Sequence, residues 1–409
     1  MEARLPRLRL DLEYIPVSYQ GRKALLIRDP LDILKEPVLL QGEALELLSL
    51  IDGRRNIPEI QVGLTRLRHG IFVPADSIHR LLDELEKAFI LESGRLRDIR
   101  QRLVQDYAAL KIRRASLAGR SYPAERRALE ELLDRILAQG SPPGPTVGRV
   151  RALVAPHIDL EAGQRAYGRA YGLLRGYPPP QTVLLMGTGH SLSLGYFSLT
   201  AKDFETPLGL VKTDRAAVQR LAALAGQAAE ADDFGHRAEH SLEFQLLFLQ
   251  HLFGSGFRLV PILCGSFQDR LAEAGRAADI PAVAPVLDFL REFLTAQGQG
   301  VLVVAGVDFF HIGPKFGHDR SAASLLGEAE RHDQQLLAAL CRRDVSAFWG
   351  EVREANDRYN VCGFSTLACL LEVLPADWPP GQVLDYGLRR EEATRSAVSF
   401  AAIAYSTGI

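Results

Sequence analysis

Apolar and polar positions alternate in blocks along the second part of the chain. Short apolar runs have the composition of buried strands: VRALVAPH, QTVLLMGTGH, FRLVPILCG, GVLVVAGVDFFH and the terminal SAVSFAAIAYS. Between them, apolar residues recur at helical spacing in AGQRAYGRAYGLLRG, TDRAAVQRLAALAGQ, HSLEFQLLFLQHLF and PAVAPVLDFLREFLTAQ. Strands that alternate with helices predict an α/β fold with a central sheet flanked by helices.

The first 95 residues follow another pattern. RKALLIRD predicts a strand, GEALELLSLID and ADSIHRLLDELEKAFIL predict amphipathic helices, and LESGRLRD predicts a small β wing. This order is typical of a winged-helix module, and LLSLIDGRRNIPEIQVGL resembles PqqD-like modules. The resemblance implies a peptide binder that uses an exposed strand edge. DNA binding through the second helix and a packing or dimerisation role are the alternatives.

The length of the chain predicts more than one domain, because 409 residues exceed what one core usually serves. We expect a small winged-helix-like domain at 1–95, a helical connector at 96–112 and an α/β domain at 113–409. An amphipathic helix is expected at 124–139, and the Pro/Gly-rich stretch at 140–148 predicts a loop.

Composition narrows the functional classes. The net charge is −2 and 47% of the residues are hydrophobic, so nothing in the bulk charge favours nucleic acid or an anionic membrane. No apolar run approaches the ~20 residues that span a bilayer, and the N-terminus lacks a signal-peptide pattern, so we expect a cytoplasmic protein. Only four cysteines occur, and we expect most to be reduced and buried. No GxGxxG, Walker or GxSxG motif occurs.

Polar residues follow the predicted strands. VAPHID ends in His157 and Asp159, LLMGTGH ends in His190, and VVAGVDFFH ends in Asp308 and His311. Ligands of open α/β sheets bind beyond the carboxyl ends of the strands. We therefore expect these side chains to converge although they are far apart in the sequence.

Two further clusters extend the set. AEHSLE places Glu239, His240 and Glu243 at the start of a predicted helix, where the two carboxylates either tune a histidine or face solvent. NVCGF places Cys362 directly before a glycine. Imidazole suits zinc, iron, copper and nickel, and thiolate favours softer ions. Because CxxC and HExxH are absent, a metal site must be assembled from distant segments.

From about residue 113 to its end the chain resembles the Memo family, which includes the bacterial AmmeMemoRadiSam system protein B. The resemblance rests on colinear segments: RRASLAGRSYPAERRALEELL, VAPHIDLEAGQRAYGRAY, LLMGTGHSLSLGYFSLTAKDFETPLGLVKTD, EHSLEFQLLFLQ, GVDFFHIGPKFG, NVCGFSTLACLLEVL and SAVSFAAIAY. It implies a fold similar to the class III extradiol dioxygenases. It also places the helix at 124–139 and the Pro/Gly loop inside the second domain.

The resemblance implies a mononuclear metal site on His157, His190 and Cys362. Iron(II) is the expected ion, copper the second candidate and zinc the third. The related dioxygenases are expected to use two histidines and a carboxylate, so the cysteine argues against assuming ring cleavage. Gly-Thr-Gly-His also stands where the family more often has Gly-Pro-Ser-His.

The same resemblance implies the catalytic groups. Asp308 and His311 match the Asp-x-x-His of the family's pocket, and His240 matches the histidine of its Glu-His-Ser segment. His311 or His240 would serve as general acid or base, because histidine titrates near neutral pH. Asp308 or Asp159 would orient an imidazole that binds the metal.

We therefore expect a metal-dependent, dioxygenase-like oxidoreductase that acts on a small molecule. The main alternative is a non-catalytic module that binds a peptide or protein and works with a radical-SAM partner, which the family's neighbours imply. A zinc hydrolase built on the same ligands is the third possibility.

Overall fold

The chain forms two compact units. The structure, a computed structural model, describes residues 4–31, 33–34, 36–140, 148–192 and 195–407. The first unit comprises Met1–Tyr107 with Glu392–Arg395, and the second comprises Ala108–Glu391 with Ser396–Ile409. Most of the predicted loop at 140–148 lies outside the described residues.

The first unit contains a small antiparallel sheet in the order β1-β2-β3. Its elements are β1 (Glu13–Tyr19), β2 (Arg22–Arg28), β3 (Val38–Gln41), α1 (Glu43–Leu48), α2 (Ile57–Leu67), α3 (Ala75–Lys87) and α4 (Gly94–Ala108). The strand and helices predicted from RKALLIRD to AFIL are confirmed. Their apolar stripes, with Ile60 and Leu64 on α2 and Ile78 and Leu82 on α3, are buried in one core.

The predicted β wing at 91–98 is wrong. Leu91 makes only an isolated bridge with Leu8, and α4 begins at Gly94. Leu96, Ile99 and Leu103 recur at helical spacing, which continues the helix through the segment expected to form a wing. Most of the expected connector at 96–112 lies in α4, and its last residue, Ile112, begins β4. The winged-helix identity of the first unit stays a prediction.

The second unit is built on a mixed sheet of 11 strands. They are β4 (Ile112–Arg113), β5 (Arg149–Ala155), β6 (Thr182–Thr188), β7 (Phe197–Leu199), β8 (Asp203–Thr206), β9 (Gly209–Thr213), β10 (Arg258–Cys264), β11 (Val301–Gly306), β12 (His311–Ile312), β13 (Gln382–Glu391) and β14 (Ser396–Thr407). The path runs β12-β14-β5-β11-β6-β10-β9-β8-β4, with β13 paired to β14 and β7 to β10. The central run from β5 to β9 is parallel, and β14 adds antiparallel pairs at one side.

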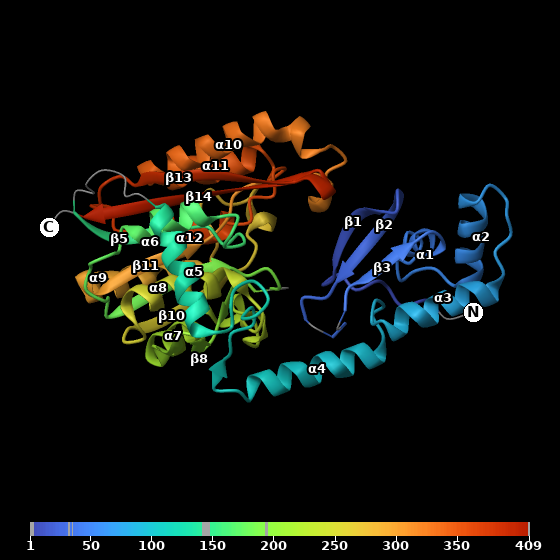
Figure 1. Cartoon of the computed structure of the whole chain (residues 1–409), viewed down its shortest axis with the longest axis horizontal. Helices are drawn as coiled ribbons and strands as arrows, with labels where there is room; N and C mark the ends of the chain where they lie inside the picture. The colour runs from blue at the N-terminus through green and yellow to red at the C-terminus, as the bar shows by residue number, and fades with distance from the viewer. Residues whose placement is uncertain (1–3, 32, 35, 141–147, 193–194, 408–409) are drawn as a thin grey trace. The chain divides into compact units, whose positions relative to one another are not determined.

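Helices cover both faces of this sheet, as Figure 1 shows. They are α5 (Arg126–Gln139), α6 (Gln164–Gly172), α7 (Arg215–Ala225), α8 (His240–Phe253), α9 (Ala284–Gln297), α10 (Ala322–Arg342), α11 (Val345–Glu354) and α12 (Phe364–Val373). On β6, Leu184 and Met186 pack with α7 and α9–α12, whereas Val183 and Leu185 pack with α5, α6 and α8. Burial on both faces explains why the strands are apolar almost throughout, and the predicted α/β sheet flanked by helices is confirmed.

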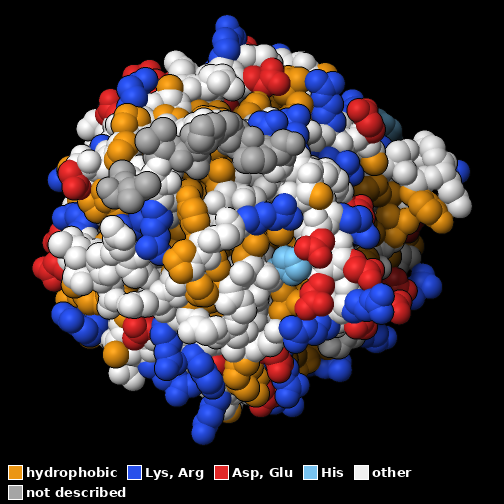
Figure 2. Space-filling model, turned by 60° about the vertical axis from the view of Figure 1, so that its left-hand side comes forward, with side chains coloured by type: hydrophobic (Ala, Val, Ile, Leu, Met, Phe, Trp, Pro, Cys, Tyr) orange, Lys and Arg blue, Asp and Glu red, His pale blue; other side chains and the backbone are white. Residues whose placement is uncertain are grey.

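The face of the molecule in Figure 2 carries side chains of both charges. On the face drawn in Figure 2, blue basic and red acidic side chains are interspersed with apolar ones. This mixture agrees with the near-zero net charge. Within the described part of the chain, no helix has the length and apolar character that crossing a bilayer requires.

A candidate metal centre at the strand ends

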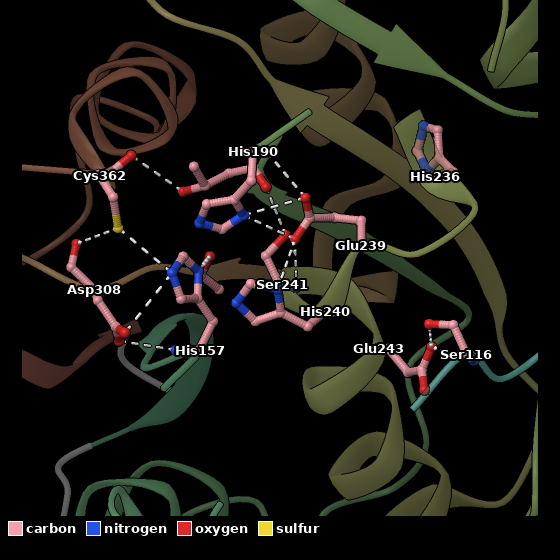
Figure 3. A network of polar contacts seen from close by, with 12 residues as sticks. Ser116, His157, His190, His236, Glu239, His240, Ser241, Glu243, Asp308 and Cys362 are labelled. Carbon is pink, nitrogen blue, oxygen red and sulfur yellow. Dashed lines mark hydrogen bonds and ion pairs between the residues drawn. The ribbon is translucent and has the colours of Figure 1, made fainter. Parts of the chain in front are cut away.

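The sheet brings the predicted polar residues together. His157, Asp308 and His190 each lie two residues beyond the end of a strand, and these strands, β5, β11 and β6, are adjacent and parallel. Their carboxyl ends therefore share one edge. His240 is the first residue of α8, and Cys362 lies two residues before α12. Figure 3 shows these side chains turned toward one another.

Three imidazoles form the centre of the site. One ligand nitrogen from each of His157, His190 and His240 lies within 4.8 Å of the others. The rings of His190 and His240 are stacked with centroids 4.7 Å apart, and His157 meets them edge-on at 4.9 and 5.0 Å. We name these three residues the histidine cluster. His157 is buried, whereas 39% of the His190 side chain is exposed, so the cluster is open on one side.

A buried carboxylate orients two of the rings. Glu239 is the N-cap of α8, and its side chain accepts a hydrogen bond from the Ser241 amide at 2.9 Å. The same carboxylate accepts from the backbone N and the Nδ1 of His190, both at 3.0 Å, and lies 3.2 Å from Nδ1 of His240. Because both Nδ1 atoms face Glu239, the Nε2 atoms remain for a metal. The sequence left open whether Glu239 faces solvent, and the structure shows that it is buried.

His157 is fixed by a backbone carbonyl. Its Nδ1 lies 3.0 Å from the carbonyl oxygen of Gly306, which favours a proton on Nδ1 and a free lone pair on Nε2. That Nε2 lies 3.4 Å from Sγ of Cys362. Metal–nitrogen and metal–sulfur bonds of about 2.1 and 2.3 Å at a tetrahedral angle separate the two donors by about 3.6 Å. The spacing of this pair therefore fits a shared metal ion.

The environment keeps two of the donors, His157 and His240, in the neutral form that binds a metal. Burial lowers the pKa of His157 well below its ordinary value, with the neighbouring imidazoles adding to the effect. Burial also lowers the pKa of His240 to about 4. His190 differs: burial lowers its pKa, but the charge of Glu239 and the hydrogen bonds to Glu239 and Cys362 together outweigh burial and raise the pKa well above its ordinary value. A cation near His190 would replace the proton that Glu239 stabilises there.

Cys362 and Asp308 complete the inner face. The thiol lies 3.5 Å from the Asp308 carbonyl oxygen, and burial raises the pKa of Cys362. The Asp308 carboxyl accepts from the amides of His157 and Ile158 at 3.0 and 3.2 Å, and burial raises its pKa to about 7. Asp159, the other carboxylate expected to orient an imidazole, accepts instead from the Glu161 amide at 2.9 Å.

His311 lies outside the histidine cluster. It is half-buried, its Nδ1 lies 3.1 Å from the Phe309 carbonyl oxygen, and its ring packs edge-on against Phe316. Burial lowers the pKa of His311 to about 4, so its imidazole is neutral near pH 7. The structure therefore places His240 among the candidate ligands and His311 outside the histidine cluster, whereas both were expected to act as acid or base.

The remaining cysteines lie elsewhere in the second unit. Cys264 and Cys369 are buried, as expected, and Cys341 is partly buried. One polar residue near the site was not predicted to have a role at all. Arg113 begins the segment RRASLAGRSY and reaches the turn before α8, and its position at the head of that motif was the only signal in the sequence.

Comparison with known proteins finds one family model and several relatives that match this chain. A family model described as Memo-like protein matches residues 113–404. A MEMO1 family protein of Aquifex aeolicus is 26% identical over 385 residues, which cover 93% of this chain and 95% of the relative. A MEMO1 family protein of Thermus thermophilus is 31% identical over 345 residues, 84% of this chain and 97% of the relative. The crystal structure of an uncharacterized protein from Escherichia coli K12 matches 63% of this chain and 99% of that chain at 15% identity, with a TM-score of 0.33.

Proposed function

The chain belongs to the Memo family, and from this premise we propose that it is a metal-dependent, dioxygenase-like oxidoreductase with one iron or copper ion at the histidine cluster. The observation that carries the proposal is the convergence of three imidazoles with the Cys362 thiol at one edge of the sheet. Two imidazoles and a thiolate suit a soft-leaning ion such as copper(I) or iron(II). When bound, the ion supplies one-electron redox chemistry and polarises a ligand in an open position.

Two donor sets are compatible with this geometry. Both use His157 and His190; one adds Cys362, as the family resemblance implies, and the other adds His240. In the first set His240 remains free to exchange a proton with a substrate. In the second set that role falls to His311, whose imidazole is neutral near pH 7 and has a lone pair that can accept a proton.

Asp308 supports the site as a proton carrier. Its carboxyl is buried against the backbone of His157, and a pKa of about 7 lets it exist in both protonation states near neutral pH. We propose that Asp308 and His311 hold and move the proton of a small substrate on the open side of the cluster.

The test is metal content after purification without oxygen. Wild type is compared with His157→Ala, His190→Ala, His240→Ala and Cys362→Ala. His251→Ala is the matched control, because His251 also lies on α8 but pairs with Asp134 at 2.8 Å. We expect near-stoichiometric iron or copper in wild type and in the control. Both donor sets predict that His157→Ala and His190→Ala lose the metal.

Cobalt(II) then separates the donor sets. A thiolate ligand gives a sulfur-to-cobalt charge-transfer band, and Cys362→Ser would remove that band, whereas His240→Ala would not. Wild type without metal, even after anaerobic reconstitution, would refute the oxidoreductase and leave a pocket that binds a peptide or protein. Tightly bound zinc would favour the hydrolase.

The proposed partners are a radical-SAM protein and a peptide. We propose that the first unit binds the peptide at the edge of its sheet, where β3 pairs with β2 alone within the described residues. We also propose that the protein acts in the cytoplasm.

A further inference from the structure

The segment at 113–122 converges on one buried residue of α8. Glu243 is fully buried, and its carboxylate accepts hydrogen bonds from the amide and the hydroxyl of Ser116, both at 3.0 Å, and from the Leu117 amide at 3.0 Å. The hydroxyl of Tyr122 and the guanidinium of Arg113 also donate to it. Figure 3 shows Ser116 at Glu243, on the same helix as His240. This segment is thus bound to the first turns of the helix that begins at the metal centre.

Arg113 extends the contact to the turn before α8. It is 1% exposed, and its Nη2 donates to the carbonyl oxygen of Glu239 at 2.8 Å. Its Nε donates to the carbonyl oxygen of His236 at 3.0 Å, while Nη1 donates to Glu243. One planar guanidinium therefore bonds to the carbonyl oxygens of His236 and Glu239 and to the carboxylate of Glu243. Lysine has the charge but lacks this fixed fork of donors.

The turn held by Arg113 carries the residue that orients the imidazoles. The carboxylate of Glu239 contacts Nδ1 of His190 at 3.0 Å and Nδ1 of His240 at 3.2 Å. A shift of the Glu239 backbone would move this carboxylate relative to both rings. Arg113 contacts the turn and Glu243 on α8, so it acts on the rings through the position of Glu239 and of the start of α8.

We propose that Arg113 is a positioning residue for the metal centre: it fixes the turn at 236–239 so that the Glu239 carboxylate meets His190 and His240 together. Where the test measures metal binding, this inference rests on the proposed function. It gives Arg113, at the head of the RRASLAGRSY segment, a role at the site in addition to its place in β4.

The test compares Arg113→Lys with Arg9→Lys. Arg9 is a matched control, because it is a fully buried arginine of the first unit whose guanidinium donates to Asp29 at 2.9 Å and to the Phe89 carbonyl oxygen at 3.0 Å. Lysine keeps the positive charge beside each carboxylate, which limits the loss of stability. We expect Arg113→Lys to weaken cobalt(II) binding about tenfold or more and to change the cobalt absorption spectrum, as outer contacts of metal ligands usually do. Arg9→Lys should change neither.

A second readout needs no metal. The backbone amides of His190 and Ser241 both donate to the Glu239 carboxylate, at 3.0 and 2.9 Å. In metal-free protein, we expect Arg113→Lys to speed hydrogen exchange at these two amides about tenfold relative to amides of β11. A general loss of stability would speed both groups alike.

The outcomes separate the two proposals. Wild-type protein that binds no metal refutes the proposed function, and hydrogen exchange still tests the role of Arg113. Unchanged exchange at His190 and Ser241 in Arg113→Lys overturns the positioning role, whatever the metal does. If wild type binds cobalt and Arg113→Lys has the same cobalt affinity and spectrum as wild type, the positioning role is overturned as well.

Discussion

His236 is a buried histidine that the metal centre does not use. It is 1% exposed, its Nε2 lies 3.0 Å from the Ser198 carbonyl oxygen, and its Nδ1 has no hydrogen-bond partner among the described residues. Burial lowers its pKa to about 4. The ring therefore stays neutral in the folded protein over a range in which an exposed histidine is charged.

This lowered pKa makes the stability depend on pH. An unfolded histidine has a pKa of about 6.5, so between pH 6.5 and 4 the unfolded chain binds a proton that the folded chain does not. The free energy of unfolding should then fall as the pH drops, and His236 should account for about 2 kcal/mol between pH 7.5 and 5. Urea unfolding of metal-free wild type and His236→Gln at both values measures it. Equal losses in the two proteins would contradict the prediction.

At the scale of single residues, the sequence identified candidate metal ligands but not the residues that they contact. His157, His190 and Asp308 were recognisable because each follows a buried apolar run. That the strands before them are adjacent depends on strand order, which no local pattern encodes. The role of Glu239 could not be predicted for a related reason, because a carboxylate at a helix start is usually a solvated cap. Only the fold shows that this carboxylate is buried against two imidazoles.

At the level of elements, close packing sets the position of α8. A Cβ built on Gly306, the last residue of β11, would lie 2.3 Å from the Ser241 carbonyl oxygen. The helix start and the strand end therefore touch without room for a methyl group. Since α8 begins with His240, this contact also sets how near that imidazole comes to the strand ends.

Gly306→Ala should therefore push the start of α8 outward. We expect a loss of about 1–3 kcal/mol in unfolding free energy, as overpacking usually costs, together with weaker metal binding. Gly327→Ala is the matched control, because Gly327 lies on α10 and its added Cβ meets nothing within 4 Å. In a helix interior this control should gain roughly 0.5–1 kcal/mol. Chemical denaturation and cobalt titration measure both, and a Gly306→Ala protein that matches wild type would refute the packing argument.

Periodicity predicted most elements and failed where two signals competed. The strands β5, β6, β10, β11 and β14 and the helices α5 to α9 follow the predicted apolar patterns, because tertiary burial on both faces of the sheet agrees with local preference. LESGRLRD predicts a small β wing, and this prediction is wrong. The helical spacing of Leu96, Ile99 and Leu103 determined the structure instead.

At the scale of the whole molecule, each unit has its own hydrophobic core. The first unit buries Ile60 and Leu64 among its helices, whereas the second buries both faces of the large sheet. Units with separate cores can unfold in separate transitions. A substitution in the core of one unit and a ligand bound to the other unit should therefore act on different unfolding transitions.

Metal binding and a core substitution provide that pair of changes. Cobalt(II) at about 100 times its dissociation constant should add about 2.7 kcal/mol to the unfolding free energy of the second unit, because only the folded histidine cluster binds it. Ile60→Ala, at a fully buried position of α2, should cost the first unit about 2–5 kcal/mol. Calorimetry with and without cobalt measures both: cobalt should raise one transition, and Ile60→Ala should lower the other while cobalt affinity stays the same. If both changes moved a single transition, the two cores would be one cooperative system, and the first unit would then contribute to the stability of the proposed metal centre.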